Sequence, residues 1–383
     1  MKILVVAQYQ NDGSPTAIFI HDQMKAYICA GHEVLAIAPV AIGKKNWHGE
    51  RLSLRTRKCT IDGIRHVFPR YLSLSRFGTK NFGSESAIMA IKTQFPAILE
   101  GFKPDVIHAH TLGFGSEIGA WLKEKIGCPL IVTTHGSDTF VPFNAGRQED
   151  LKDYSNKADA VVCVSSLLGR RLIDSGVTVP VSTILNGFDV SYVSRNTSKK
   201  QNLVIQVGNL IPRKKTDISI RAIAELAKRT EDIRFTVVGS GQEKESLEKL
   251  CEALGIADLV TFTGQLPNQE VQQKMAEATF FVMPSVREGF GIVYLEAMAA
   301  GCVVIGTEGE GIADLIINGE NGFLVPADDT EAVVHVIQTC MDHPQRAALI
   351  ADRGRESAQK LTWKYNVEQY QSLFQKLVNE ETA

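Results

Sequence analysis

The sequence predicts an α/β protein made of two tandem, doubly wound parallel-sheet domains that face a cleft. Its 383 residues are enough for two domains at roughly 100–200 residues each. Short apolar runs alternate with amphipathic stretches along the whole chain, and this alternation restarts after residue 200. Strands that are apolar on both faces and separated by helices are typical of parallel sheets covered on both sides. Ligands of such sheets bind at the carboxyl ends of the strands, so we expect a small-molecule site in the cleft.

The first half begins with the apolar run Lys2–Ala7, which predicts a buried strand. The amphipathic stretch Phe19–Ala30 predicts a helix that ends at Gly31. The later apolar runs predict strands at Glu33–Ala38, Asp105–His110, Leu130–Thr134, Ala160–Ser165 and Ser182–Leu185.

The second half repeats the pattern. Its expected strands are Leu203–Gly208, Arg234–Gly239, Leu259–Thr263, Phe280–Pro284, Val303–Gly306 and Phe323–Val325, with helices at Thr216–Lys228 and Glu243–Leu254. The polar stretch Asp189–Asn202 predicts a linker. We therefore place a first domain at 1–190 and a second at 191–361. The final helix, within residues 362–383, is expected to pack back onto the first domain.

Composition excludes several classes of function. The formal net charge of −2 argues against nucleic-acid binding, which calls for a clearly basic domain. Seven cysteines without a CxxC pair, and histidines without HExxH spacing, predict neither a disulfide framework nor a metal site. No apolar run is long enough for a signal peptide or a membrane span. We expect a cytoplasmic protein, and weak peripheral contact with the inner face of the membrane stays open.

The densest motif runs from Ser285 to Gly301, reads SVREGFGIVYLEAMAAG and follows an apolar strand. It predicts a strand, a glycine-rich turn and a helix. Gly289 and Gly291 lack a Cβ and allow a ligand to approach the backbone. The free N–H groups and the positive dipole end at the helix start favour an anion, so a phosphate or diphosphate is the expected guest.

Two glutamates flank this turn. Glu296 lies five residues past Gly291, roughly 7–8 Å along a helix axis. That distance suits a carboxylate that accepts hydrogen bonds from the vicinal hydroxyls of a sugar attached to the phosphate. Glu288 lies at the turn, where a carboxylate can meet a transferred sugar or an attacking hydroxyl. Surface glutamates are common, so the joint pattern carries the prediction and neither residue carries it alone.

The spacing Glu288–Glu296 around Gly289-Phe290-Gly291, followed by Ala297-Met298-Ala299-Ala300-Gly301, resembles the signature of the family-four retaining glycosyltransferases of the GT-B fold. The resemblance covers nearly the whole chain, and the segments that share it are Gly31–Val34, Lys103–His108, Thr133–Gly136, Leu185–Asp189 and Val237–Gly241. Thr16–Lys25 looks like members that build bacterial surface polysaccharides. The resemblance implies transfer of a sugar from a nucleoside diphosphate sugar, with UDP favoured, to a sugar or lipid-linked acceptor hydroxyl. It also implies that the domain at 1–190 is the acceptor-side domain and that the domain at 191–361 binds the nucleotide sugar.

The resemblance also implies roles for single residues. Lys214 falls where the family places its diphosphate-binding lysine, and His135 falls where a histidine lies beside the donor sugar. Gly13 lies in the loop that approaches the diphosphate, and Asn209 stands where the family usually has arginine. Arg213 is expected to supply that missing charge. Since the family uses neither cofactor nor metal, protein cations and N–H groups must stabilise the leaving diphosphate.

Other interpretations stay open. A basic run such as Arg213–Lys215 is commonly a solvated loop, and His135, His108 and His110 can each be structural histidines near strand ends. The same fold serves nucleotide-sugar epimerases and phosphorylases; the latter need a lysine for pyridoxal phosphate. A non-catalytic nucleotide-sugar binder is a further alternative, and Asn209 is its sequence signal.

Overall fold

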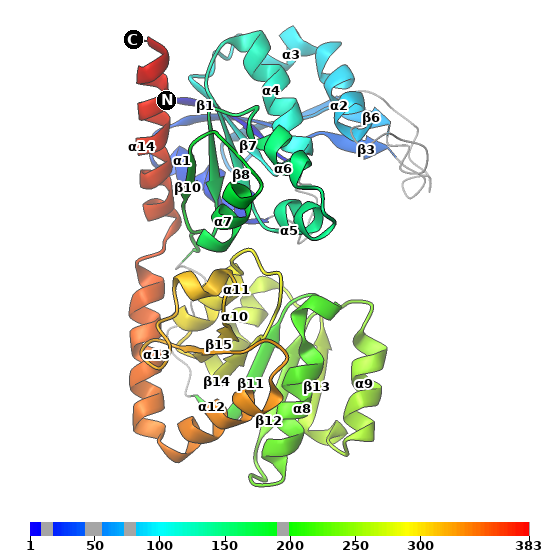
Figure 1. Ribbon diagram of the computed structural model, residues 1–383, viewed down its shortest axis with the longest axis vertical. Helices are drawn as coiled ribbons and strands as arrows, with labels where there is room; N and C mark the ends of the chain where they lie inside the picture. The colour runs from blue at the N-terminus through cyan, green and yellow to red at the C-terminus, as the bar shows by residue number, and fades with distance from the viewer. Residues whose placement is uncertain (9–17, 43–55, 73–81, 190–198, 383) are drawn as a thin grey trace. The chain divides into compact units, whose positions relative to one another are not determined.

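The computed structural model describes residues 1–8, 18–42, 56–72, 82–189 and 199–382. The chain divides into two compact units (Figure 1). Unit 1 comprises Met1–Leu185 and Trp363–Ala383, and unit 2 comprises Asn186–Thr362. This division falls slightly before the boundary expected at residue 190.

Unit 1 is built on an eight-stranded sheet in the order β10-β9-β8-β7-β1-β2-β5-β4. Its strands are β1 (Lys2–Val6), β2 (Glu33–Ile37), β4 (Arg57–Ile61), β5 (Ile64–Phe68), β7 (Val106–His110), β8 (Leu130–Thr134), β9 (Ala160–Cys163) and β10 (Val181–Thr183). Every pair except β4–β5 is parallel, which confirms the predicted parallel arrangement. A separate small sheet pairs β3 (Val40–Ile42) with β6 (Arg70–Leu72).

The antiparallel edge strand β4 was not anticipated from the sequence. It forms a hairpin with β5 through Asp62 and Gly63, whose φ angles are +49° and +78°. Two successive residues with positive φ make the tight turn that suits the right-handed twist of paired strands, and Asp-Gly is a strong signal for it. Most residues of β4 are exposed or half-buried, and its sequence is mainly polar. It therefore lacks the apolar run by which the other strands were predicted.

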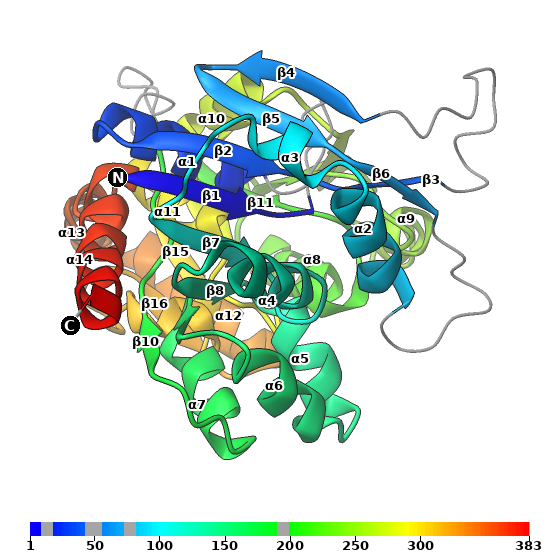
Figure 2. The same cartoon turned by 90° about the horizontal axis from the view of Figure 1, so that it is seen from above.

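The helices of unit 1 are α1 (Ile18–Cys29), α2 (Phe82–Lys92), α3 (Phe95–Leu99), α4 (Phe114–Ile126), α5 (Ser137–Asn144), α6 (Gln148–Ser155), α7 (Ser166–Asp174) and α14 (Trp363–Thr382). They pack around the parallel strands, as the view from above shows (Figure 2). Helix α1 ends at the predicted glycine. Gly31 has a φ of +83°, and the N–H of His32 donates to the carbonyl of Tyr27 at 3.0 Å. Gly31 and His32 therefore end the helix, and β2 begins at the next residue, Glu33.

Helix α14, the last helix of the chain, belongs to unit 1 and packs against α1. The amide of Gln23 donates to Asn366 Oδ1 at 2.8 Å, and Asn366 Nδ2 donates to the carbonyl of Leu185 at 2.8 Å. Phe374 is fully buried in the same core as Tyr27. Polar anchoring at one end and apolar burial along the helix therefore attach the C-terminal segment to the N-terminal sheet.

Unit 2 carries a six-stranded, all-parallel sheet in the order β13-β12-β11-β14-β15-β16. Its strands are β11 (Lys200–Val207), β12 (Arg234–Val238), β13 (Val260–Gly264), β14 (Ala278–Val282), β15 (Val303–Thr307) and β16 (Phe323–Val325). Its helices are α8 (Thr216–Ala227), α9 (Lys244–Ala253), α10 (Asn268–Glu277), α11 (Ile292–Ala299), α12 (Thr330–Asp342) and α13 (Pro344–Gln359), with short 3-10 turns at Pro212–Lys214, Ala257–Leu259 and Gly311–Asp314.

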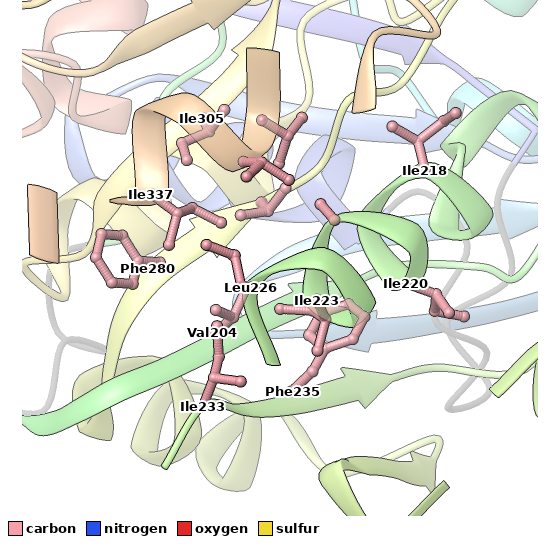
Figure 3. Close-up of a cluster of buried hydrophobic side chains, with 14 of the residues drawn as sticks. Val204, Ile218, Ile220, Ile223, Leu226, Ile233, Phe235, Phe280, Ile305 and Ile337 are labelled. Atoms are coloured by element: carbon pink, nitrogen blue, oxygen red, sulfur yellow. The ribbon is translucent and has the colours of Figure 1, made fainter. Parts of the chain in front are cut away.

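One face of this sheet buries an apolar cluster under α8 and α12 (Figure 3). Val204 and Phe280 come from neighbouring central strands, Leu226 comes from α8 and Ile337 from α12. All four side chains are at most 1% exposed. This packing fixes the central strands, and the loops that leave their carboxyl ends are positioned by it.

The linker predicted at Asp189–Asn202 is partly wrong. Residues 190–198 lie outside the described part of the chain, but β11 already begins at Lys200. The ammonium group of Lys199 donates to the carbonyls of Ala278 and Ala300, both at 2.7 Å. These residues cap the C-terminal ends of α10 and α11. A cation is stabilising at a helix C-terminus. Lys199, which the sequence places in a linker, is therefore part of the structure of unit 2.

Replacement of Phe374 tests the attachment of α14. We expect Phe374→Ala to lower the free energy of unfolding by about 3–5 kcal/mol, because it opens a cavity in the core of unit 1. Gln375→Ala, at the exposed neighbouring position, is the matched control. It should change the free energy of unfolding by less than about 0.5 kcal/mol. Urea unfolding measures both; equal stability of the two variants would contradict the packing described.

Candidate functional site

The candidate site of unit 2 lies where two neighbouring parallel strands end. Strands β11 and β14 pair side by side, so their carboxyl-end loops leave the sheet together. The N–H of Val286, in the loop after β14, donates to the carbonyl of Arg213, in the loop after β11, at 2.8 Å. This hydrogen bond joins the basic run to the glycine-rich turn, which are about seventy residues apart in sequence.

Two cations meet one carboxylate at this junction. Glu288 Oε2 accepts from Lys214 Nζ at 2.5 Å and from Arg213 Nη1 at 3.2 Å. Glu288 and Lys214 are each 9% exposed, so both charges are largely withdrawn from water. Removal of one partner from such a cluster leaves an uncompensated buried charge, which is strongly unfavourable. The structure thus brings together three residues that the sequence nominated separately.

The backbone around Lys214 is also fixed. Gln206, buried in β11, donates from its amide to the carbonyl of Lys214 at 3.1 Å and to Thr216 Oγ1 at 3.0 Å. A Cβ added at Gly208 would lie 3.6 Å from Lys214 Cε, so the strand end contacts the lysine side chain. Gln206 is a supporting residue that the sequence analysis missed, because a glutamine inside an apolar strand carries no motif.

The glycine turn ends in the predicted helix. Gly291 caps α11 with a φ of +80°, and a Cβ there would lie 2.8 Å from the Tyr294 ring. The Tyr294 hydroxyl donates to the carbonyl of Met283 at 2.6 Å and contacts Ser285 Oγ at 3.0 Å. Tyr294 therefore holds both ends of the turn, and only glycine fits at position 291 without strain.

The other nominated residues of this unit have different surroundings. Phe290 is 1% exposed, so its ring belongs to the core and only its backbone can face a ligand. Glu296 lies on α11 and is partly exposed, on the helix that begins at Gly291. Asn209 is exposed directly after β11. Arg213, from the same loop, contacts Glu288, and its role in place of the missing arginine stays a prediction.

Glycine is also required at a second loop. The carbonyl of Gly289 would lie 1.9 Å from a Cβ added at Gly311, so the loops after β14 and β15 are in direct backbone contact. Three loops, which follow β11, β14 and β15, therefore converge around Glu288.

In unit 1, His135 follows β8 at the carboxyl end of the sheet. Its Nε2 lies 3.0 Å from His110 Nδ1, and its ring packs against Phe19 with centroids 4.8 Å apart. Asp138 accepts from the N–H groups of His135 and Gly136 at 3.1 and 2.9 Å. The carboxylate thereby fixes the turn that presents the histidine. Gly13 lies outside the described residues.

His108, an alternative candidate, has a structural role. It is fully buried; its Nε2 lies 2.8 Å from Thr133 Oγ1 and its Nδ1 lies 3.2 Å from the Tyr27 hydroxyl. Thr133 Oγ1 in turn lies 2.8 Å from the Tyr370 hydroxyl of α14. Both ring nitrogens are therefore engaged within the fold, and His108 is a satisfied core histidine.

Burial keeps this histidine group neutral. It lowers the pKa of His108 to about 3 and that of His135 to about 4, and it holds the pKa of His110 well below its usual value. Since the charged form is disfavoured in each case, His135 at neutral pH is an uncharged imidazole, which can hydrogen-bond but adds no charge.

The described residues contain no group of three or more His, Cys, Asp or Glu side chains that could hold a metal ion. Among the same residues, no helix is both long and apolar enough to cross a membrane. Metal-independent chemistry stays a prediction. A pocket of about 570 Å³ lies elsewhere in unit 2, lined by Asn202, Thr279 and Gly301 near the amino ends of the central strands. Ligands of such sheets bind at the carboxyl ends, so the Glu288 cluster is the better candidate.

Two doubly wound parallel units, one of which holds two cations beside a glycine turn at a helix start, have the architecture of the GT-B fold. The sequence matches the model of glycosyltransferase family 4 over residues 17–192 and that of group 1 glycosyl transferases over residues 192–357. The chain belongs to this family of glycosyltransferases.

Known proteins resemble the chain over most of its length. The putative colanic acid biosynthesis glycosyltransferase WcaL of Salmonella typhimurium is 25% identical and is matched over 88% of this chain and 91% of its own. Among solved structures, sucrose-phosphate synthase of Thermosynechococcus elongatus aligns with a TM-score of 0.81 at 20% identity, over 99% of both chains. Anabaena HepE in complex with UDP-glucose aligns with a TM-score of 0.75 at 21% identity, over 98% of this chain and all of its own. At these identities the structures show the fold.

The buried histidines predict a pH dependence of stability. Their pKa values are lowered in the folded protein, so unfolding takes up protons once the pH falls below about 6.5, the value in the unfolded chain. Stability should be fully present above pH 6.5 and should decrease between pH 6.5 and 4. The expected slope is about 1.4 kcal/mol per pH unit for each such histidine.

Urea unfolding of unit 1 between pH 7 and 5 measures this slope. His108→Gln removes one titrating group and should reduce the slope by about 1.4 kcal/mol per pH unit, whatever its effect on stability at pH 7. An unchanged slope in that variant would contradict the neutral, buried state of His108.

Proposed function

We propose that this glycosyltransferase moves a sugar from a nucleoside diphosphate sugar, with UDP as the nucleotide, to an acceptor hydroxyl with retention of anomeric configuration. The observation that carries the proposal is the meeting of Lys214 and Arg213 with Glu288 at the start of α11. A nucleoside diphosphate has the charge and size to use these cations together with the N–H groups at Gly291.

The chemistry follows from these groups. The acceptor oxygen forms a bond to the anomeric carbon while the bond from that carbon to the β-phosphate oxygen breaks. Lys214 and Arg213 stabilise the negative charge that develops on the departing diphosphate. The acceptor's proton passes to the leaving phosphate on the same face, so no second protein base is needed. Glu288 faces the transferred sugar, and Glu296 accepts hydrogen bonds from the ribose hydroxyls.

His135 of unit 1 completes the proposed set of residues. A neutral imidazole can hydrogen-bond a sugar hydroxyl as donor or acceptor, depending on its tautomer. The relation to WcaL supports a role in the synthesis of a cell-surface polysaccharide or glycolipid, and HepE, as a UDP-glucose complex of the same fold, supports UDP. The acceptor would then be a sugar or a lipid-linked sugar, met in the cytoplasm at the inner face of the membrane.

The first test is a thermal-shift panel of UDP, GDP, UDP-glucose, UDP-galactose, UDP-N-acetylglucosamine and GDP-mannose. A ligand that binds only the native state at a hundred times its Kd stabilises it by about 2.7 kcal/mol. We expect shifts with UDP and at least one UDP-sugar. A GDP-specific shift would overturn the nucleotide assignment, and no shift at all would overturn the proposal. Interconversion of a bound sugar without acceptor would indicate an epimerase.

Lys214→Ala should abolish UDP binding and transfer, because it removes the buried cation and leaves Glu288 to repel the diphosphate. A loss of at least 100-fold in UDP affinity, about 2.7 kcal/mol, is expected by calorimetry. Lys215→Ala is the control, since Lys215 pairs with Asp328 at 2.6 Å and should leave affinity within threefold. Near-normal UDP binding by Lys214→Ala would contradict the role of Lys214 in binding the diphosphate.

Glu288→Gln should separate binding from chemistry. The carboxylate of Glu288 partly neutralises Lys214, so its removal should strengthen UDP binding by about threefold to tenfold. Transfer should fall by at least 100-fold, because the group that faces the sugar loses its charge. Weaker UDP binding in this variant would show that Glu288 supports the diphosphate and does not compete with it.

A further inference from the structure

The carboxylate of Glu310 lies at the back of the glycine-rich turn. Its Oε1 accepts from the N–H of Arg287 at 2.9 Å, and its Oε2 accepts from the N–H of Glu288 at 2.8 Å. Both oxygens of one side chain are thus bound by two successive backbone donors of the loop after β14. Glu310 itself comes from the loop after β15 and is only partly exposed.

The backbone at this point has an unusual conformation. Arg287 has a φ of +55°, in the left-handed region that residues with a Cβ rarely adopt. Left-handed residues turn successive N–H groups toward the same side and create a concavity that binds anions. Here the anion is internal: Glu310 occupies the concavity, and charge-assisted hydrogen bonds of this kind are strong enough to offset the local strain.

Further contacts fix the same loop on both sides. The N–H of Gly311 donates to the carbonyl of Glu288 at 3.3 Å, and the N–H of Val286 donates to the carbonyl of Arg213 at 2.8 Å. The backbone of Glu288 is therefore held by the loop after β15, and Val286, two residues before it, is held by the basic loop. Because the backbone of Glu288 is fixed in this way, its carboxylate is in position to accept the hydrogen bond from Lys214.

We propose that Glu310 is a positioning residue for Glu288: its carboxylate fills the concavity of the Arg287–Glu288 turn and thereby aims the Glu288 carboxylate at Lys214. Glu310 acts through the backbone, because both of its carboxylate oxygens accept from backbone N–H groups. The inference rests on the proposed function, in which Glu288 faces the transferred sugar, because only then does the position of the Glu288 carboxylate affect sugar transfer. The contact itself can be measured without any substrate.

Glu310→Gln is the decisive variant, because glutamine keeps the shape but replaces one acceptor oxygen with an NH₂ group that opposes a backbone N–H. Glu308→Gln is the matched control, an exposed carboxylate on the same loop. Hydrogen–deuterium exchange of the peptide that spans residues 285–291 is measured in the ligand-free protein. We expect at least tenfold faster exchange at Arg287 and Glu288 in Glu310→Gln, and wild-type exchange in Glu308→Gln.

A double-mutant cycle with UDP tests whether Glu310 acts through Glu288. Glu310→Gln alone should change UDP affinity in the same direction as Glu288→Gln, and the double variant should bind no more tightly than Glu288→Gln. A general loss of stability would instead weaken binding in every background. Additive effects on UDP affinity would overturn the positioning role.

The outcomes separate the two proposals. Unchanged exchange in Glu310→Gln, or equal acceleration in Glu308→Gln, overturns the inference whether or not UDP binds. Failure of the wild-type protein to bind UDP overturns the proposed function, and the exchange measurement then still decides whether Glu310 holds the turn.

Discussion

The ion cluster of Lys214, Arg213 and Glu288 is the interaction on which the candidate site depends. Two cations share one carboxylate, and of the three side chains Lys214 and Glu288 are largely buried whereas Arg213 is 39% exposed. Buried charges are tolerated only where geometry and hydrogen bonds offset the loss of hydration. The fold meets this condition because parallel strands deliver their carboxyl ends to one edge of the sheet. The surplus positive charge of the cluster is the property on which the proposed diphosphate binding rests.

Close backbone approach is the second constraint. Gly291 starts α11 in a left-handed conformation, and Gly311 lies against the carbonyl of Gly289. A side chain at either position would push the loops apart and move Glu288 away from the cations. The glycines therefore keep the loops in the position that the charge cluster requires, and the Glu310 side chain binds the backbone of the same loop.

Unit 1 presents its candidate residue by different means. His135 is a half-buried neutral imidazole beside the buried His110, and Asp138 organises the turn through backbone N–H groups. One unit offers cations in a polar cluster, whereas the other offers an uncharged hydrogen-bonding group. The proposed reaction needs both kinds, since a leaving diphosphate requires charge stabilisation and a sugar hydroxyl requires directional recognition.

The sequence by itself determined the parallel α/β architecture and most strand positions, because apolar runs buried on both faces have few other solutions. It also singled out Glu288 and Gly291, whose spacing is local, and Lys214, through the family resemblance of the chain. It did not reveal that Lys199 caps two helices or that Glu310 binds the Arg287–Glu288 turn. Those contacts join segments that are distant in sequence, and their partners are backbone carbonyl and N–H groups that every residue carries. Only the tertiary structure decides which side chain reaches which backbone group, because strand order and loop path bring them together.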